Sequence, residues 1–310
     1  KGGERGRYVR KMHAKEYNFD AEVDFMKRVR HPFVTAAVCW EPYEGGDSDA
    51  SSAKSVIMEW VGGGESGDYL YDVGYQQPAD QAAATLRRLI GQLVEAIEYV
   101  HAAGMVHGDL KPENILVDVD GNLRIIDFDL SAPASSPRAR SGTRTTIAPE
   151  VAQVIRGPLH EAGDWWSVGA TVLLWTAALR CGQEERANAS DANRLCSYRP
   201  FIFVRAENRY VINALPDGFP EDIRRFAFHL LDPRPDNRRF VSAQDLKALR
   251  ETLGLGVQYN YNKAAEVEQG RSDKSDTSAT RHHSSAFTQS SPSGGSTSGS
   301  QGVSSSQGTS

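Results

Sequence analysis

The sequence predicts an α+β fold with two lobes, a small mixed lobe followed by a larger and mainly helical one. Two short strand patterns occur near the start of the chain, at residues 7–12 and 55–60, with a helical pattern at residues 20–30 between them. Glycines 62–64 then break the pattern, and the helical segments beyond them are longer. We therefore expect a small lobe at residues 1–64, a large lobe at 65–258 and a disordered tail rich in Ser and Gly at 259–310.

Two further elements of the large lobe are predicted from local patterns. Apolar residues recur at helical spacing between positions 80 and 103, and Gly104 supplies a helix stop. Apolar runs at 115–117 and 123–126 flank Asp120-Gly121-Asn122, which indicates a β-hairpin. A calcium loop beginning at Asp118 is excluded, because its sixth position needs Gly and holds Leu123.

Composition excludes several classes of protein. The 310 residues are 39% hydrophobic and 24% charged, which is typical of a chain with a sizeable core. A net charge of -5 argues against a nucleic-acid-binding protein, which needs a basic face. The apolar run at 165–179 is shorter than the roughly 20 residues of a membrane span, so we expect a buried helix and no transmembrane segment.

Three scattered cysteines, Cys39, Cys181 and Cys196, do not form a zinc motif or a disulfide framework. We expect ordinary thiols in the core or in loops. The alternative is a disulfide between Cys181 and Cys196 in an oxidising compartment, where Asn188-Ala189-Ser190 would also be a glycosylation acceptor.

The strongest functional signal is a set of three linked motifs. Residues 107–114 read His-Gly-Asp-Leu-Lys-Pro-Glu-Asn, residues 127–129 read Asp-Phe-Asp, and residues 148–150 read Ala-Pro-Glu. Their order and spacing are those of a phosphoryl-transfer site, which needs a base, oxygen ligands for a metal and a cation on the phosphate. We expect Asp109 to be the base and Lys111 to neutralise the transferred phosphate, while Asn114 and Asp127 hold Mg²⁺.

On these motifs the chain resembles the eukaryotic protein kinase superfamily from residue 7 to about 250, and Lys111 resembles the Ser/Thr type. The resemblance implies the two-lobed protein kinase fold, ATP and Mg²⁺ as cofactors and a protein as substrate. Lys11, in Tyr8-Val9-Arg10-Lys11, resembles the phosphate-binding lysine, and Glu22 resembles its partner on a helix. The alternative for Lys11 and Glu22 is a surface lysine and a solvated helix glutamate.

The same resemblance implies an adenine site and several architectural contacts. Met58 resembles the gatekeeper, and the backbone near Glu59 and Val61 would meet adenine above Leu116. Glu65 resembles a contact to ribose or to a substrate arginine, with a solvated turn charge as the alternative. The other implied contacts are Thr143 between Asp109 and Lys111, an ion pair of Glu150 with Arg238, and Asp164 on the catalytic-loop backbone.

The chain departs from the family pattern in four places. No glycine-rich loop precedes Lys11, either through truncation or because none exists, so the small lobe is reduced. Gly108 replaces the usual Arg, so activation-loop phosphorylation through that residue is not expected. Asp129 replaces a Gly, where it would add a metal ligand or restrict movement of the motif. Val9 replaces the usual Ala and narrows the adenine slot.

The missing loop and Gly108 together resemble the rhoptry-kinase-like branch of divergent apicomplexan kinases, in particular its with-no-Gly-loop group. That branch implies secretion into a parasite organelle or vacuole, whereas an ordinary kinase would be cytoplasmic. Our leading hypothesis is a protein Ser/Thr kinase that transfers the γ-phosphate of ATP to protein hydroxyls. The alternative is a non-catalytic pseudokinase that serves as a binding or scaffold module.

Overall fold

The computed structural model describes ten segments of the chain and one further residue: 7–13, 16–42, 54–134, 136–139, 142–153, 156–158, 161–187, 204–206, 209–211, 220–238 and 251. All of them belong to one structural unit, Lys1–Ala265. The expected tail at 259–310 lies outside the described residues, as do Asn188 and Cys196.

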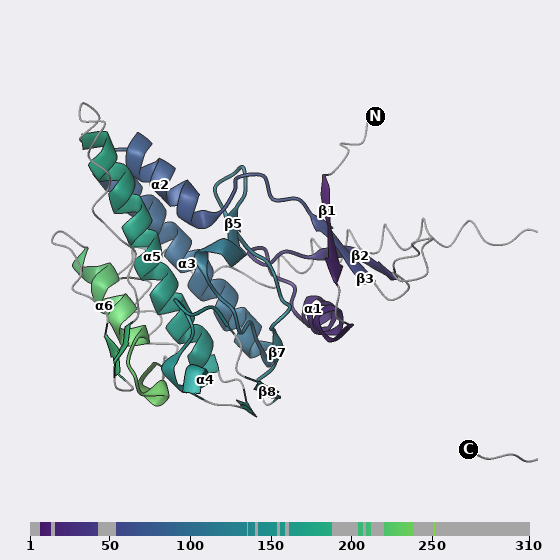
Figure 1. Ribbon diagram of the computed structural model, residues 1–310. Coiled ribbons are helices and arrows are strands. Elements are labelled where there is room, and N and C mark those ends of the chain that lie inside the picture. Colours follow the sequence, from purple (N-terminus) through teal and green to yellow (C-terminus); the bar gives the residue numbers. More distant parts are fainter. Residues whose placement is uncertain are drawn as a thin grey trace, which may run out of the picture. The chain divides into compact units, whose positions relative to one another are not determined.

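The small lobe is a three-stranded antiparallel sheet packed on one helix (Figure 1). The sheet has the order β1-β3-β2, and the four elements are β1 (Tyr8–His13), α1 (Glu16–Arg28), β2 (Ala37–Pro42) and β3 (Lys54–Glu59). The two predicted strands are confirmed with shifts of one residue, whereas α1 begins four residues earlier than the pattern indicated. Phe25 and Met26 of α1 are buried, so the helix packs its apolar face inward.

The large lobe is mainly helical, and α2, α3 and α5 lie side by side in it (Figure 1). Its helices are α2 (Ser66–Gln76), α3 (Ala79–Ala102), α4 (Pro149–Gln153), α5 (Glu161–Ala187) and α6 (Glu221–Leu230), with short 3-10 turns η1 (Pro112–Asn114) and η2 (Pro235–Arg238). The helix predicted at 80–103 is confirmed as α3, and the apolar positions that predicted it are all buried: Leu86, Leu89, Ile90, Leu93, Ala96, Ile97 and Val100.

Two glycines allow α2 and α5 to approach each other closely. A Cβ atom on Gly74 of α2 would lie 2.0 Å from the carbonyl oxygen of Leu179, and one on Gly182 of α5 would lie 2.0 Å from that of Tyr71. Both distances are shorter than any van der Waals contact, so only glycine fits at these positions. The run at 165–179 is thus part of a buried helix, as predicted, and none of the described helices is long and apolar enough to cross a membrane.

Short antiparallel strand pairs connect the helices. The pairs are β5 (Ile115–Val117) with β6 (Leu123–Ile125), β4 (Met105–Val106) with β7 (Ala132–Pro133), β8 (Pro137–Ala139) with β9 (Arg156–Pro158), and β10 (Val204–Ala206) with β11 (Arg209–Val211). The β5–β6 hairpin is the predicted one, and Gly121 has the positive φ of +81° that its turn needs. Ile125 also exchanges backbone hydrogen bonds with Phe33 and Thr35, which attaches the small lobe to the hairpin.

The cysteines differ from the first expectation in one respect. Cys39 of β2 is free and half-buried, as expected. Cys181 of α5 is disulfide-bonded, so the expectation of an ordinary thiol there is wrong and the disulfide alternative is favoured.

The predicted ion pair of Glu150 with Arg238 is confirmed. Arg238 is fully buried and donates two hydrogen bonds to the Glu150 carboxylate, at 2.6 and 2.9 Å. Its guanidinium also lies over the ring of Trp166, 4.8 Å from the ring centroid. This ion pair attaches α4, which carries Glu150, to η2, which carries Arg238. Removal of either partner would leave the charge of the other without compensation.

Candidate functional site

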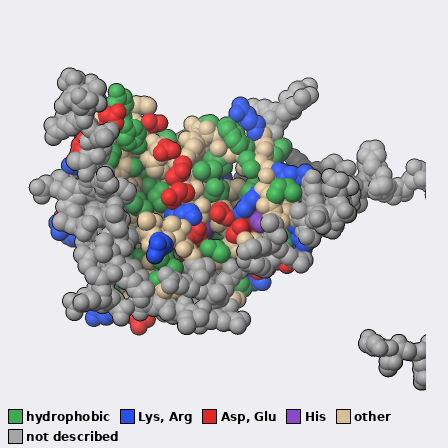
Figure 2. Space-filling model, in the orientation of Figure 1, with side chains coloured by type: hydrophobic (Ala, Val, Ile, Leu, Met, Phe, Trp, Pro, Cys, Tyr) green, Lys and Arg blue, Asp and Glu red, His purple; other side chains and the backbone are tan. Residues whose placement is uncertain are grey.

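A cavity of about 490 Å³ lies between the sheet of the small lobe and the β5–β6 hairpin. Its lining residues are Val9, Arg10, Lys11, Thr35, Met58, Glu59, Trp60, Val61, Asn114, Leu116, Ile126 and Asp127. Seven of the predicted site residues are among them, whereas Arg10, Thr35, Trp60 and Ile126 were not predicted. Figure 2 shows acidic and basic side chains gathered near the centre of this face, with hydrophobic side chains beside them.

Lys11 of β1 is the centre of a charge cluster. Its Nζ atom lies 3.0 Å from Oε1 of Glu22, 2.7 Å from Oδ1 of Asp127 and 2.6 Å from Oδ1 of Asp129. Strand β1 thus presents its lysine both to helix α1 and to the segment after β6. The contact between Lys11 and Glu22 was predicted, whereas the contact to Asp129 was not.

The neighbouring charges change two ionisation equilibria. Burial by itself would lower the pKa of Lys11, but the carboxylates of Glu22, Asp127 and Asp129 outweigh it and raise that pKa. Burial would likewise raise the pKa of Asp127, and the hydrogen bond and charge of Lys11 lower it instead. Both side chains therefore carry their charge across the physiological range.

The backbone at Asp127 is held in a sparsely populated conformation. Asp127 has a φ of +64°, and it is the one described residue other than glycine with a positive value. The next residue, Phe128, is buried and stacks on Phe25 of α1 with ring centroids 4.1 Å apart. The ring of His107 meets Phe128 edge-on at 5.5 Å. This packing couples the position of Asp127 to helix α1 and to the catalytic loop.

Asp109 and its neighbours form a second, separate set of contacts. Oδ1 of Asp109 accepts hydrogen bonds from the backbone N–H and the hydroxyl of Thr143, at 2.7 and 2.8 Å. Lys111 donates to Oδ2 of Asp109 at 2.8 Å and to the Thr143 hydroxyl at 2.9 Å. Asn114 donates to the Asp109 carbonyl oxygen at 2.9 Å. The bridging position predicted for Thr143 is thus confirmed.

Asp164 at the start of α5 holds the backbone of the catalytic loop, residues 107–114, through hydrogen bonds. Its carboxylate accepts the backbone N–H groups of His107 and Gly108, at 2.8 and 2.9 Å, and lies 3.0 Å from Nε2 of His101. Burial would raise the pKa of Asp164, but these contacts outweigh it and lower the pKa. The predicted role of Asp164 on the loop backbone is confirmed.

The predicted adenine contacts line the cavity from two elements, the end of β3 and the hairpin strand β5. Strand β3 ends at Glu59, the segment 60–65 follows, and the cavity is lined by Met58, Glu59 and Val61 from this side and by Leu116 from β5. Glu65 does not line the cavity, but its backbone forms a bridge with Leu116. Burial and the charges of Glu113 and Asp68 raise the pKa of Glu65.

The donor set of the cavity fits a magnesium ion. Asn114 uses its Nδ2 for Asp109, which leaves Oδ1 for a cation. Asp127 pairs with Lys11 through Oδ1 and keeps a second carboxylate oxygen. An amide oxygen and a carboxylate are the hard ligands that Mg²⁺ prefers, and both residues line the same cavity.

Gly108 is a structural requirement of this loop. It has a φ of +82°, and a Cβ atom there would lie 2.6 Å from the carbonyl oxygen of Leu130. No side chain fits this backbone, so the arginine usual in the family could not be introduced without moving the loop.

A two-lobed α+β fold, with a cavity between its sheet and a hairpin, a lysine paired with carboxylates and an aspartate on the loop before β5, is the arrangement of the protein kinase fold. The family model of the protein kinase domain matches residues 7–248, and the chain belongs to this family.

Plant kinases are among the curated relatives. The chain is 33% identical over 228 residues to CBL-interacting protein kinase 8 of Oryza sativa subsp. japonica, which covers 70% of this chain and 44% of that protein. It is 32% identical over 236 residues to CBL-interacting serine/threonine-protein kinase 24 of Arabidopsis thaliana, covering 73% of this chain and 45% of that protein. The matched region therefore spans less than half the length of these relatives.

Proposed function

We propose that the chain is an active Ser/Thr protein kinase that transfers the γ-phosphate of Mg-ATP to a protein hydroxyl. The observation that carries this proposal is that Lys11, Asn114 and Asp127 line one cavity, while Asn114 is hydrogen-bonded to Asp109. A binding module has no physical need for a metal-ligand pair and a base in this arrangement. Ser/Thr specificity is supported by Lys111, which lies on Asp109, and by the names of the relatives.

The residues would divide the reaction between them. Lys11 would bind a phosphate oxygen of the nucleotide, with Glu22 orienting its ammonium group. Asn114 and Asp127 would hold Mg²⁺, which when bound neutralises phosphate charge. Asp109 would accept the proton of the attacking hydroxyl, and Lys111 would stabilise negative charge on the transferred group. Met58, Glu59, Val61 and Leu116 would position adenine, and Glu65 would contact ribose or a substrate arginine.

The test is Mg²⁺-dependent transfer from labelled ATP to the chain itself and to a generic basic protein. We expect incorporation by the parent protein and none by an Asp127→Ala variant with an unchanged circular dichroism spectrum. Folded parent protein without incorporation would refute the catalytic proposal.

The second candidate is a pseudokinase that serves as a scaffold, and Asp129 is the observation that favours it. Its carboxylate lies 2.6 Å from the Lys11 ammonium, so a nucleotide phosphate would have to compete with Asp129 for this lysine. Binding of ATP with no transfer, or absence of both, would support this candidate. Regulation would differ from most relatives in either case, because Gly108 offers no cation to a phosphorylated activation segment.

A finer proposal places the chain in the rhoptry-kinase-like branch with no glycine loop, and it rests on Gly108. The native transcript upstream of Lys1 tests it directly. A glycine-rich loop encoded there would exclude that branch and leave an ordinary kinase.

A further inference from the structure

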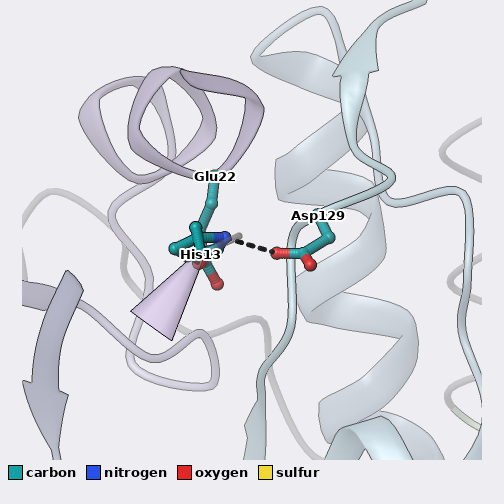
Figure 3. Close-up of side chains that lie close together, drawn as sticks. All are labelled: His13, Glu22 and Asp129. Carbon is teal, nitrogen blue, oxygen red and sulfur yellow. Dashed lines mark ion pairs between the residues drawn. The ribbon is translucent and has the colours of Figure 1, made fainter. Parts of the chain in front are cut away.

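Beside the proposed nucleotide site, three side chains from distant parts of the sequence meet: His13, Glu22 and Asp129 (Figure 3). His13 ends strand β1, Glu22 lies in helix α1, and Asp129 follows Phe128 in the large lobe. One nitrogen or oxygen atom from each lies within 4.8 Å of the others. None of the predicted roles uses His13.

Two of these side chains carry polar atoms that the described residues leave unsatisfied. Nε2 of His13 and Oε2 of Glu22 are buried and have no hydrogen-bond partner in the described part of the chain. They lie 2.6 Å apart, an ion-pair distance, but without the alignment that an N–H···O hydrogen bond needs. The side chains are 2% and 0% exposed. Buried polar atoms are nearly always paired, so these two indicate a bound group.

The donor atoms select the class of that group. One imidazole nitrogen with two carboxylate oxygens is a ligand set for zinc-class cations, with water as the fourth ligand, whereas Mg²⁺ prefers oxygen ligands alone. Ligand atoms around tetrahedral Zn²⁺ lie about 3.4 Å apart when the bonds are about 2.1 Å long. Nδ1 of His13 lies 3.6 Å from Oδ1 of Asp129, close to that separation, and Oε2 of Glu22, which lies 2.6 Å from Nε2, would turn towards Nδ1 to complete the site.

We propose that His13, Glu22 and Asp129 form a binding site for a zinc-class divalent cation, separate from the magnesium ligands. The site shares two carboxylates with Lys11, because Glu22 and Asp129 pair with that lysine through Oε1 and Oδ1. A bound cation therefore weakens the hold of both carboxylates on Lys11 and repels its ammonium group. Resting on the proposed function, the consequence is that zinc releases Lys11 for the nucleotide phosphate and so favours ATP binding.

The binding test uses Co²⁺ as a spectroscopic probe of the purified full-length chain, with His282→Gln, His283→Gln and Cys39→Ser introduced to remove other metal ligands. We expect one equivalent of Co²⁺ to give the visible absorption of a tetrahedral site, and Zn²⁺ to displace it. Excess Mg²⁺ should not displace it, because Mg²⁺ prefers octahedral oxygen sites. Absence of a tetrahedral spectrum with folded protein would refute the proposal.

Matched histidine variants locate the site. His13→Gln should weaken Co²⁺ binding by at least the roughly 10- to 100-fold that loss of a supporting group costs. His229→Gln, a change at an exposed histidine of α6, should leave binding unchanged. Equal binding in both variants, each with the parent's circular dichroism spectrum, would overturn the assignment. It would then favour a protonated His13 that bridges the two carboxylates.

A kinetic measurement tests the effect of zinc on ATP binding independently of the Co²⁺ spectra. Free Zn²⁺ should lower the KM for ATP of the parent protein and leave that of His13→Gln unchanged. If the parent shows no transfer at all, the Co²⁺ spectra still decide the metal site, and failure of the proposed function remains distinguishable from failure of this inference. An equal effect of zinc on the KM of both proteins would contradict the shared-carboxylate mechanism.

Discussion

The charges around Asp109 and those around Lys11 are compensated to different degrees. In the catalytic loop, Asp109 pairs with Lys111 and accepts two hydrogen bonds from Thr143, while Asp164 fixes the loop backbone. Around Lys11, one ammonium group faces three carboxylates, those of Glu22, Asp127 and Asp129.

The difference has a physical consequence. The catalytic loop has its charges paired within the protein, so it is preorganised before any ligand binds. The Lys11 cluster carries excess negative charge among the described residues, and further cations reduce its mutual repulsion. On the proposed function, the first region would position a reacting group, and the second would accept metal ions with their ligands.

The largest expected effect comes from removing the charge of the preorganised region. Asp109→Asn keeps the shape of the side chain but removes the base, so transfer should fall by about 10²- to 10⁴-fold. Affinity for ATP should change little, since Asp109 does not line the cavity. The measurement is kcat with equilibrium binding of a fluorescent nucleotide. A large loss of nucleotide affinity would mean that the two regions are not separate.

The second effect is on stability. Asp164→Asn removes the charge and replaces one of the two oxygens that accept backbone N–H groups with an amide NH2, so the free energy of unfolding should fall by about 1.5–3 kcal/mol for the charged hydrogen bond lost. Urea unfolding followed by circular dichroism measures it. Asp120→Asn, a change in an exposed turn, is the control and should leave stability unchanged. Similar stability in both variants would show that the loop is not anchored as described.

The third effect is on the KM for ATP and comes from the Lys11 cluster. Asp129→Asn removes one of three negative charges from Lys11 without changing size, so the nucleotide phosphate has less competition. The KM for ATP should fall, by tenfold at most if the change in binding free energy stays below about 1.4 kcal/mol. A rise in KM would mean instead that Asp129 supports nucleotide binding as a further metal ligand.

The smallest effects are on the pH dependence of stability, which has opposite signs in the two regions. The pKa of Asp164 is lowered by folding, so its contribution to stability is present above pH 3.8 and is lost as the pH falls through the folded value. The pKa of Lys11 is raised, so its contribution is present below pH 10.5 and is lost at more alkaline pH. Unfolding free energies from pH 3 to 7 should therefore depend less on pH in Asp164→Asn than in the parent. Equal slopes would contradict this assignment.

Much of the fold was predictable because its signals are local. The periodicity of α3, the turn before β6 and the motif at 107–114 each depend on residues within a few turns of one another. The start of α1 was misplaced by four residues, since the pattern marks the buried face rather than the first turn. The roles of the predicted site residues remain predictions until the variants are measured.

The sequence by itself determined the family, the order of the catalytic motifs and the hairpin that joins Asn114 to Asp127, because those residues are close in the chain. Only the tertiary structure decided that Asp129 reaches Lys11 and that His13 and Glu22 meet it. Asp129 and Lys11 are separated by 118 positions, and their contact depends on how the lobes pack. Packing of that kind is set by many buried side chains together, and no short motif records it.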